Sequence, residues 1–524
     1  MIKKITAPQT KTKAASTEPN SKASPLFSMA WLWPLIGLLL LTYGLLAFNS
    51  GLTLSPLSNH SDNPAAIATT VLHQASSGVD MRGSTEVQQV VPAWVNVMAQ
   101  ISSSEYAYGD DGISDTNIYY FSMSETRRHV LSTHMTLGLV LMVAGFLQFW
   151  PAFRRRYRKA HRLIGVTYIL AAFISMAMSG HHLINSGIAN TYNTFVFHIG
   201  LWIMLVGVLV SLTMAGIAVL RKDIARHLGW QALGFGFLLT APLQRMDWLI
   251  LSTMADGVSF NEMNILVNTI LFAQATLAGL CLFWLNRASS PLRKNTVLSI
   301  TPLTKPVQYM GYGAIALGAL VLMLPVVMSV GIGDIGLLQR IVPALPLAWL
   351  ATLFDRAWLP AFVLLLIVLL TSAWTQLSAV RAGAGLSATQ ERVTFISLLV
   401  VVLMLFYGAF QLGMPTHARS SGGSGLAVMG ALLLVFGVLL QRATLRAERG
   451  KVIESLQLVL LCATAPVLFV INCLMFDLIG AVPAEYLARS AAYEIAVIGA
   501  LFVPLLAGGL LSIYSAETER YCVS

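Results

Sequence analysis

The sequence is poor in charge: Asp, Glu, Lys and Arg together make up 11% of the 524 residues, against about 25% in an ordinary soluble domain. Hydrophobic residues make up 56%, and the mean hydropathy is +0.71. This composition excludes a soluble globular enzyme, a disordered chain and a nucleic-acid-binding module. The four cysteines, Cys281, Cys462, Cys473 and Cys522, do not form the pattern of a disulfide framework. The sequence also lacks a phosphate-binding loop and a His-Glu-x-x-His motif, so no soluble type of catalysis is indicated.

Long apolar runs dominate the chain instead. A transmembrane helix needs about 20 apolar residues, and twelve runs are long enough: 29–49, 130–150, 163–184, 194–220, 229–251, 264–286, 309–330, 358–380, 393–413, 425–441, 455–477 and 491–514. The sequence therefore predicts an all-α fold, a polytopic transmembrane helix bundle of about 12 spans. The stretch 331–357 is apolar but contains several prolines, and we expect it to be interfacial or re-entrant.

Basic residues predict the orientation. If the N-terminus is cytoplasmic, 25 of the 33 Lys and Arg residues fall on the cytoplasmic side, as the positive-inside rule requires. The strongest anchor is the loop Arg154–Lys159. An even number of spans then places both the N-terminus and the C-terminus in the cytoplasm. We expect a multi-pass protein of the bacterial cytoplasmic (inner) membrane, in contact with the lipid bilayer and with anionic lipid headgroups at the cytoplasmic face, and with no nucleic-acid partner.

The runs divide the chain into seven segments. We expect a disordered cytoplasmic leader at 1–28, a first transmembrane anchor at 29–49, a periplasmic segment at 50–128, a His-rich five-helix membrane core at 129–286 (spans 2–6), a cytoplasmic linker at 287–308, a second membrane block at 309–514 (spans 7–12) and a cytoplasmic tail at 515–524. The anchor is read as uncleaved, because its apolar core is longer than that of a signal peptide. No internal repeat is evident, since the second membrane block is nearly free of histidine.

Histidines mark the most informative part of the chain. Seven of the ten histidines lie in or beside spans 2–5, and ionisable residues inside a membrane are costly and are candidate functional residues. Counting residues from the span ends places polar side chains of four consecutive helices at one depth near the outer surface: His134, His182, His198, Arg245 and Asp247.

A second level lies at the cytoplasmic ends of spans 3 and 5, with His161 and His227. Helical phase connects the two levels. His227 and Arg245 are 18 residues apart, or five whole turns, and therefore share a helix face. His134 and Gln148 are 14 residues apart and lie within about 40° of the same face. Each helix can thus present an inner and an outer polar group to the interior of the bundle.

One hypothesis is a redox protein that binds haem b. Haem b takes axial histidines from facing helices. His134 and His198 are the candidate axial ligands, and Arg245 is a candidate partner for a haem propionate. His182 is a further candidate cofactor-binding residue at this level. His161 and His227 offer a second, inner pair. Along span 3, however, His161 and His182 are about 31 Å apart, which argues against a two-haem path. Quinone or an outer protein would be the redox partner.

Two other functions stay open. His134, Arg245 and Asp247 can form a protonatable site in a proton-coupled transporter of a small anionic solute. Alternatively, the protein is a membrane sensor or assembly factor that works through segment 50–128. His161 and His227 also suit binding of anionic lipid headgroups. Whether the chain is an enzyme is left open.

The stretch from His134 to about Trp248 resembles a bacterial membrane-protein family, domain of unknown function 2306. The resemblance rests on His134, Gly138, Gly145, Gln148, Arg154, Arg155, Arg156, His161, Arg162, Gly165, Tyr168, His227, Trp230 and Arg245. The family usually has paired basic residues followed by Trp-Met after the second histidine, where this chain has Leu228-Gly229-Trp230. His181, His182 and His198 are not part of the family pattern. The resemblance implies a multi-span membrane protein of unestablished activity, and adds Gln148, Arg162 and Tyr168 as candidate site residues.

Overall fold

The computed structural model describes residues 31–58, 63–110, 112–187, 195–254, 260–288, 302–331, 358–385, 387–413, 423–479 and 491–518. All regular secondary structure in these ranges is helical, which confirms the all-α prediction. The expected leader at 1–28, nearly all of the stretch 331–357, most of the linker 287–308 and the end of the tail lie outside the described residues.

The first membrane block contains the helices α1 (Leu32–Leu54), α7 (Glu125–Phe149), α9 (Arg158–Ser186), α10 (Phe195–Leu220), α11 (Ile224–Leu238), α12 (Thr240–Met254) and α13 (Phe260–Ala288). A short helix, α8 (Pro151–Arg156), joins α7 to α9. Close backbone contact between α11 and α13 requires glycine, since a Cβ atom on Gly279 would lie 2.9 Å from the carbonyl oxygen of Ala232. Small residues at such contacts are typical of packed membrane helices.

Within the described residues, eleven helical stretches are long and apolar enough to cross a membrane. The expected span 229–251 is not among them, because it is divided at Leu239 into α11 and α12, of 15 residues each. Pro242 explains the break: proline lacks an N–H group and clashes with the preceding turn of a helix. The other eleven expected spans coincide with helices or helix pairs of the structure.

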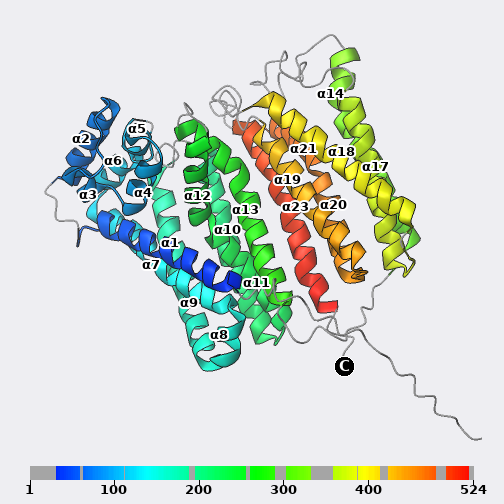
Figure 1. Ribbon diagram of the computed structural model, residues 1–524, viewed down its shortest axis with the longest axis horizontal. Coiled ribbons are helices and arrows are strands. Elements are labelled where there is room, and N and C mark those ends of the chain that lie inside the picture. Colours follow the sequence, from blue (N-terminus) through cyan, green and yellow to red (C-terminus); the bar gives the residue numbers. More distant parts are fainter. Residues whose placement is uncertain are drawn as a thin grey trace, which may run out of the picture.

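Segment 50–128 contains a small helical domain, which was not predicted from the sequence. Its helices are α2 (Pro64–Ser76), α3 (Thr85–Val90), α4 (Ala93–Ile101), α5 (Ser104–Tyr108) and α6 (Asp115–Ser122); we call residues 63–122 the cap. Three of these helices begin at a polar residue whose side chain accepts a backbone N–H, namely Asn63, Ser84 and Ser103. The core of the cap includes Trp248 of α12 and Met263 of α13, so the cap packs on the ends of these membrane helices (Figure 1).

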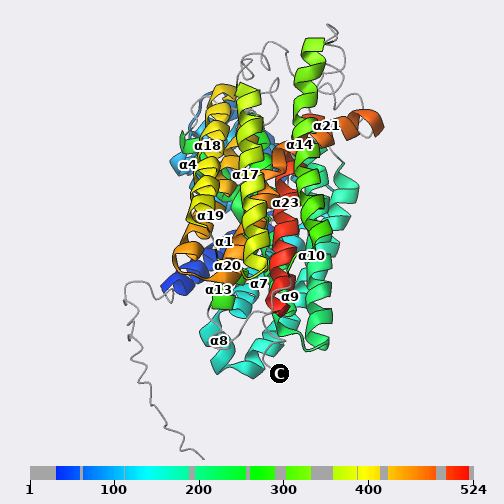
Figure 2. The same cartoon turned by 90° about the vertical axis from the view of Figure 1, so that its right-hand side faces the viewer.

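The second membrane block repeats the helix order of the first. Its helices are α14 (Lys305–Gly331), α17 (Trp358–Arg381), α18 (Ala388–Leu412), α19 (Ser424–Leu445), α20 (Arg449–Ala463), α21 (Ala465–Ile479) and α23 (Ala491–Thr518). Helices α14 and α17 pack side by side (Figure 2). Like α11 and α12, the helices α20 and α21 have 15 residues each and are separated by one residue, Thr464.

The two breaks share a local sequence. Thr240-Ala241-Pro242 lies at the first break and Thr464-Ala465-Pro466 at the second. In both, the threonine hydroxyl donates a hydrogen bond to the carbonyl three residues earlier, that of Phe237 or Leu461. The two blocks therefore share the order of their helices and a divided helix at the corresponding place in that order.

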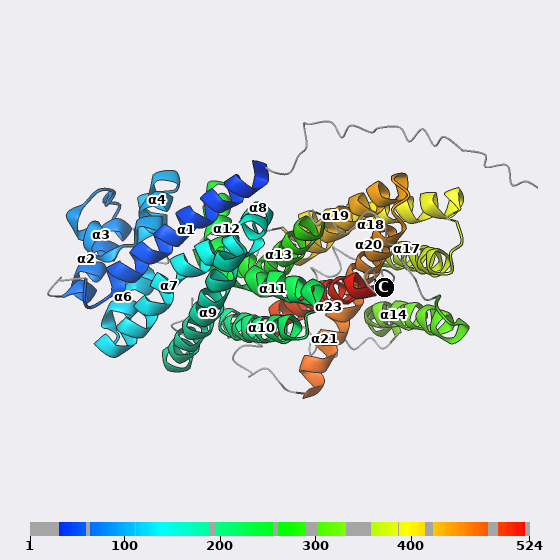
Figure 3. The same ribbon diagram turned by 90° about the horizontal axis from the view of Figure 1, so that it is seen from below.

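Some helix pairs pack in the same way in the two blocks. Helix α10 packs on α11 as α19 packs on α20, and α12 packs on α13 as α21 packs on α23. The last helices of the two blocks, α13 and α23, pack against each other, and we call this contact the seam (Figures 1 and 3). At one end of the seam Arg287 of α13 forms an ion pair with Glu454 of α20, which also accepts a hydrogen bond from Trp284 at 2.9 Å.

Candidate functional site

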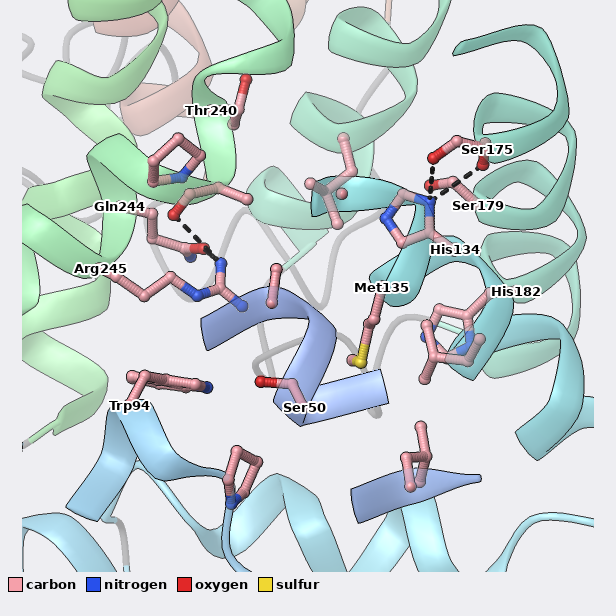
Figure 4. A pocket seen from close by; sticks show the side chains of 18 of the residues that line it. Ser50, Trp94, His134, Met135, Ser175, Ser179, His182, Thr240, Gln244 and Arg245 are labelled. Carbon is pink, nitrogen blue, oxygen red and sulfur yellow. Dashed lines mark hydrogen bonds between the residues drawn. The ribbon is translucent and has the colours of Figure 1, made fainter. Parts of the chain in front are cut away.

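A cavity of about 250 Å³ lies where the cap meets the first membrane block. It is enclosed by α1, α7, α9, α10, α12 and the cap (Figure 4). Its polar lining includes His134, Ser175, His182, Thr240, Gln244 and Arg245. Among the described residues that line it there is no Asp or Glu. The cavity therefore combines basic and neutral polar groups without an acidic side chain.

His134 is fixed by α9. Its Nδ1 atom lies 3.0 Å from the carbonyl oxygen of Ser175 and 2.9 Å from the Ser175 hydroxyl. The other ring nitrogen is on the cavity side of the imidazole (Figure 4). With Nδ1 engaged, Nε2 is the atom of His134 that can meet a ligand, as an acceptor in the neutral ring and as a donor in the protonated ring.

Arg245 approaches the same cavity from α12. Its guanidinium donates to the side-chain oxygen of Gln244 at 2.7 Å and lies 5.2 Å from the ring centre of Trp94 and 5.3 Å from that of Trp248. The two indoles stack on each other at 5.7 Å. Arg245 is thus held between the cap and its own helix, and it is close enough to His134 for the two charges to interact.

The beginning of α12 also faces the cavity. Thr240, Ala241 and Pro242 line it and form the first turn of α12. The first turn of a helix carries N–H groups without intrahelical partners and the positive end of the helix dipole. Together with Arg245 and His134, this helix end makes the cavity suitable for an anion.

The expected outer level is only partly brought together. His182 lines the cavity and its ring meets Tyr120 edge-on at 6.1 Å. His198 does not line the cavity; its Nε2 accepts a hydrogen bond from Trp202 at 3.2 Å. Asp247 is directed to α13, where Gln274 donates to its carboxylate at 2.9 Å. Of the predicted outer residues, His134, His182 and Arg245 share one cavity.

This geometry bears on the haem hypothesis. The candidate axial ligands His134 and His198 do not line a common cavity, and the Nε2 atom of His198 is engaged by Trp202. The volume of about 250 Å³ is below the roughly 300–1,000 Å³ of pockets for drug-sized ligands. The described residues therefore fit a small solute better than haem, and haem binding stays a prediction.

The expected inner level lies at the other end of the block, near α8. His227 Nδ1 is 2.9 Å from the carbonyl oxygen of Ala215, and Gln148 donates to the carbonyl oxygen of His161 at 3.2 Å. Both histidines are close enough to Arg154 to interact with its charge. Burial, with the neighbouring charge of Arg155, lowers the pKa of the Arg154 guanidinium. This cluster of basic groups is compatible with the expected binding of lipid headgroups.

The remaining candidates have different surroundings. Tyr168 is fully buried, with its ring 6.3 Å from that of Phe235, whereas Arg162 is exposed. Trp94, Ser175 and Gln244 were not predicted. The Thr-Ala-Pro tripeptide at the break beside Gln244 recurs in the second block but also occurs at Thr6-Ala7-Pro8, so it does not by itself signal the break. No pattern in the sequence marks Trp94 or Ser175.

Comparison with known proteins adds one relationship. No curated protein and no solved structure matches the chain. A family model described as "Predicted membrane protein (DUF2306)" matches residues 131–285, which run from α7 to α13 and include His134, His182 and Arg245. Residues 131–285 are therefore similar to the DUF2306 family of predicted membrane proteins.

Proposed function

We propose that the protein transports a small anionic solute across the membrane, by way of the cavity beneath the cap. The observation that carries this proposal is the pair of helices broken at corresponding positions, at Leu239 and Thr464, in two blocks of the same helix order. Broken helices in corresponding positions of a repeat are a recurring feature of transporter binding sites.

The first break opens onto the cavity. In transporters, the N-terminus of a half-helix points its positive dipole end at the anionic group of the substrate. Here the half-helix is α12, whose first residues line the cavity with Arg245. The small volume and the absence of acidic lining residues in the described part of the cavity favour a compact anion, such as a short carboxylate or phosphate.

His134 links binding to pH. When its ring is neutral, Nε2 is a hydrogen-bond acceptor and repels an anion's oxygen atoms; when the ring is protonated, Nε2 donates and adds a positive charge. Arg245 opposes that protonation, and a bound anion offsets the repulsion between the two groups. Binding of the anion is therefore expected to tighten as the pH falls.

Uptake into proteoliposomes tests the proposal. The full chain is reconstituted into liposomes, and radiolabelled acetate, succinate or inorganic phosphate is added to the outside solution. An inward proton gradient is then imposed. We expect uptake of at least one probe, and its loss in His134→Ala and in Arg245→Ala. Arg158→Ala, a change at an exposed arginine near α8, is the matched control and retains uptake. Uptake that is equal in wild type and both cavity variants contradicts the assignment.

The haem hypothesis has a separate test. A dithionite-reduced minus oxidised absorption spectrum of the purified protein, with haem supplied during expression, decides it, and a flat haem region would remove the hypothesis. A haem spectrum that is lost in both His134→Ala and His198→Ala would instead support the redox function, with quinone or an outer protein as partner.

A further inference from the structure

The seam between the two blocks contains a buried polar cluster that is separate from the cavity. Glu494 of α23 is 3% exposed, and Asn264 and Asn268 of α13 are 0% exposed. The carboxyl group of Glu494 is hydrogen-bonded by the side chain of Asn268. Asn264 lies one helical turn from Asn268, on the same face of α13. The carboxyl group of Glu494 and the amide of Asn268 thus meet between the last helices of the two blocks, and the buried Asn264 lies one helical turn from Asn268.

Part of this cluster has unused hydrogen-bonding capacity. Among the described residues, both amide atoms of Asn264 and the Oε1 atom of Glu494 have no hydrogen-bond partner. Buried polar groups are nearly always paired, and unpaired ones call for an explanation such as a functional role. Purely structural packing at this contact would be served better by apolar side chains.

No described cation neutralises Glu494. The basic side chains in the described parts of the helices packed against α23 have other partners or positions: Arg287 pairs with Glu454, Lys451 with Glu448 and Arg226 with Asp223, Arg449 donates to the carbonyl of Val380, His227 bonds Ala215, His198 bonds Trp202, and Arg442 lies in the last turn of α19. An ionised carboxylate in such surroundings is costly, whereas a protonated one is neutral and can donate a hydrogen bond.

We propose that the Glu494 carboxyl group binds and releases the proton that drives transport, with Asn268 as its hydrogen-bonding partner. The proposal rests on the proposed transport function and names its coupling site. The proton adds to a carboxylate oxygen from water on the cap side and leaves to water on the other side, and no electron moves. The seam suits this role because the halves of parallel-repeat transporters rock against each other, which would expose Glu494 to the two sides in turn.

Packing favours a proton over a metal cation. Neither the cavity beneath the cap nor the apolar cavity between α14, α17 and α20 is lined by Glu494 or Asn264. A bound metal cation needs several oxygen ligands and the room to arrange them. A proton needs only the carboxylate oxygen that accepts it.

Infrared spectroscopy of the full chain in lipid tests proton binding without any solute. We expect a carbonyl band of a neutral carboxylic acid that is lost as the pH rises from about 5 to about 10. The band is absent at every pH in Glu494→Gln, shifted in Glu494→Asp and unchanged in the control Glu391→Gln, a change in the first turn of α18. Spectra of wild type and Glu494→Gln that coincide across this range would overturn the inference, as would a band that never titrates.

Transport measurements distinguish this inference from the proposed function. We expect Glu494→Gln to exchange the probe across the membrane but to lose accumulation of the probe driven by a proton gradient. In wild type, where one proton is coupled, uptake changes by at most about tenfold per pH unit. Gradient-driven accumulation in Glu494→Gln equal to wild type overturns the coupling site and leaves the cavity proposal intact. If wild type takes up no probe, the transport proposal fails and the infrared result alone decides whether Glu494 exchanges a proton. The Glu494→Asp protein retains the carboxyl group and serves as the control for effects of substitution at this position on folding.

Discussion

Removal of the Arg245 guanidinium should weaken anion binding more than any other single change in the cavity. A hydrogen bond to a charged group contributes about 1.5–3 kcal/mol, and 1.4 kcal/mol corresponds to a tenfold change in Kd. Arg245→Ala should therefore raise the Kd for the transported probe by about 10- to 150-fold. The side chain is already positioned by Gln244, Trp94 and Trp248, so little of the binding energy is spent on ordering it.

Arg245→Lys separates charge from geometry. Lysine keeps the positive charge but loses the planar guanidinium that lies against the two indoles, and we expect an intermediate Kd. The assay is isothermal titration calorimetry of the purified protein with the probe, at two ionic strengths. A Kd for Arg245→Ala that is unchanged from wild type would refute the view that the anion meets this side chain, provided that the thermal unfolding of the two proteins is similar.

Two further predictions concern the helices. Replacing the prolines at the two breaks, by Pro242→Ala or Pro466→Ala, restores a backbone N–H group that proline lacks and should lower the uptake rate if the breaks serve transport. Pro306→Ala, in the first turn of α14, is the control. Unchanged uptake in both break variants would show that the breaks are only structural. Gly279→Ala should destabilise the first block by about 1–3 kcal/mol through overpacking, because its Cβ would press on the backbone of α11. The control Gly216→Ala should be tolerated, because the Cβ there meets open space. Equal denaturation midpoints for the two variants would contradict the close contact between α11 and α13.

The depth of residues along the membrane could be predicted from the sequence, but their direction around each helix could not. The rise of 1.5 Å per residue fixes depth once a span is recognised, so His134, His182 and Arg245 were placed at one level and do share the cavity. His198 and Asp247 have the same expected depth but are directed to other partners. Which helices are neighbours depends on long-range packing that a hydropathy pattern does not contain.

The cap and the repeat were missed for different reasons. The helices of the cap have 5 to 13 residues, too short for a clear periodicity, and their signal is in the capping residues Asn63, Ser84 and Ser103. The shared helix order of the two blocks shows most clearly at the divided helices, of 15 residues each in both blocks, and a hydropathy pattern does not mark such a division. Glu494 has a clear signal in the sequence, because it is the only acidic residue in the run 491–514.

Uptake of the radiolabelled probes by proteoliposomes, compared between wild type, Arg245→Ala and liposomes without protein, tests the central claim most directly. The account predicts that wild type accumulates a small anion under an inward proton gradient and that Arg245→Ala accumulates no more than liposomes without protein. Equal accumulation by wild type and Arg245→Ala, or none above the protein-free liposomes for any of acetate, succinate and phosphate, would contradict it.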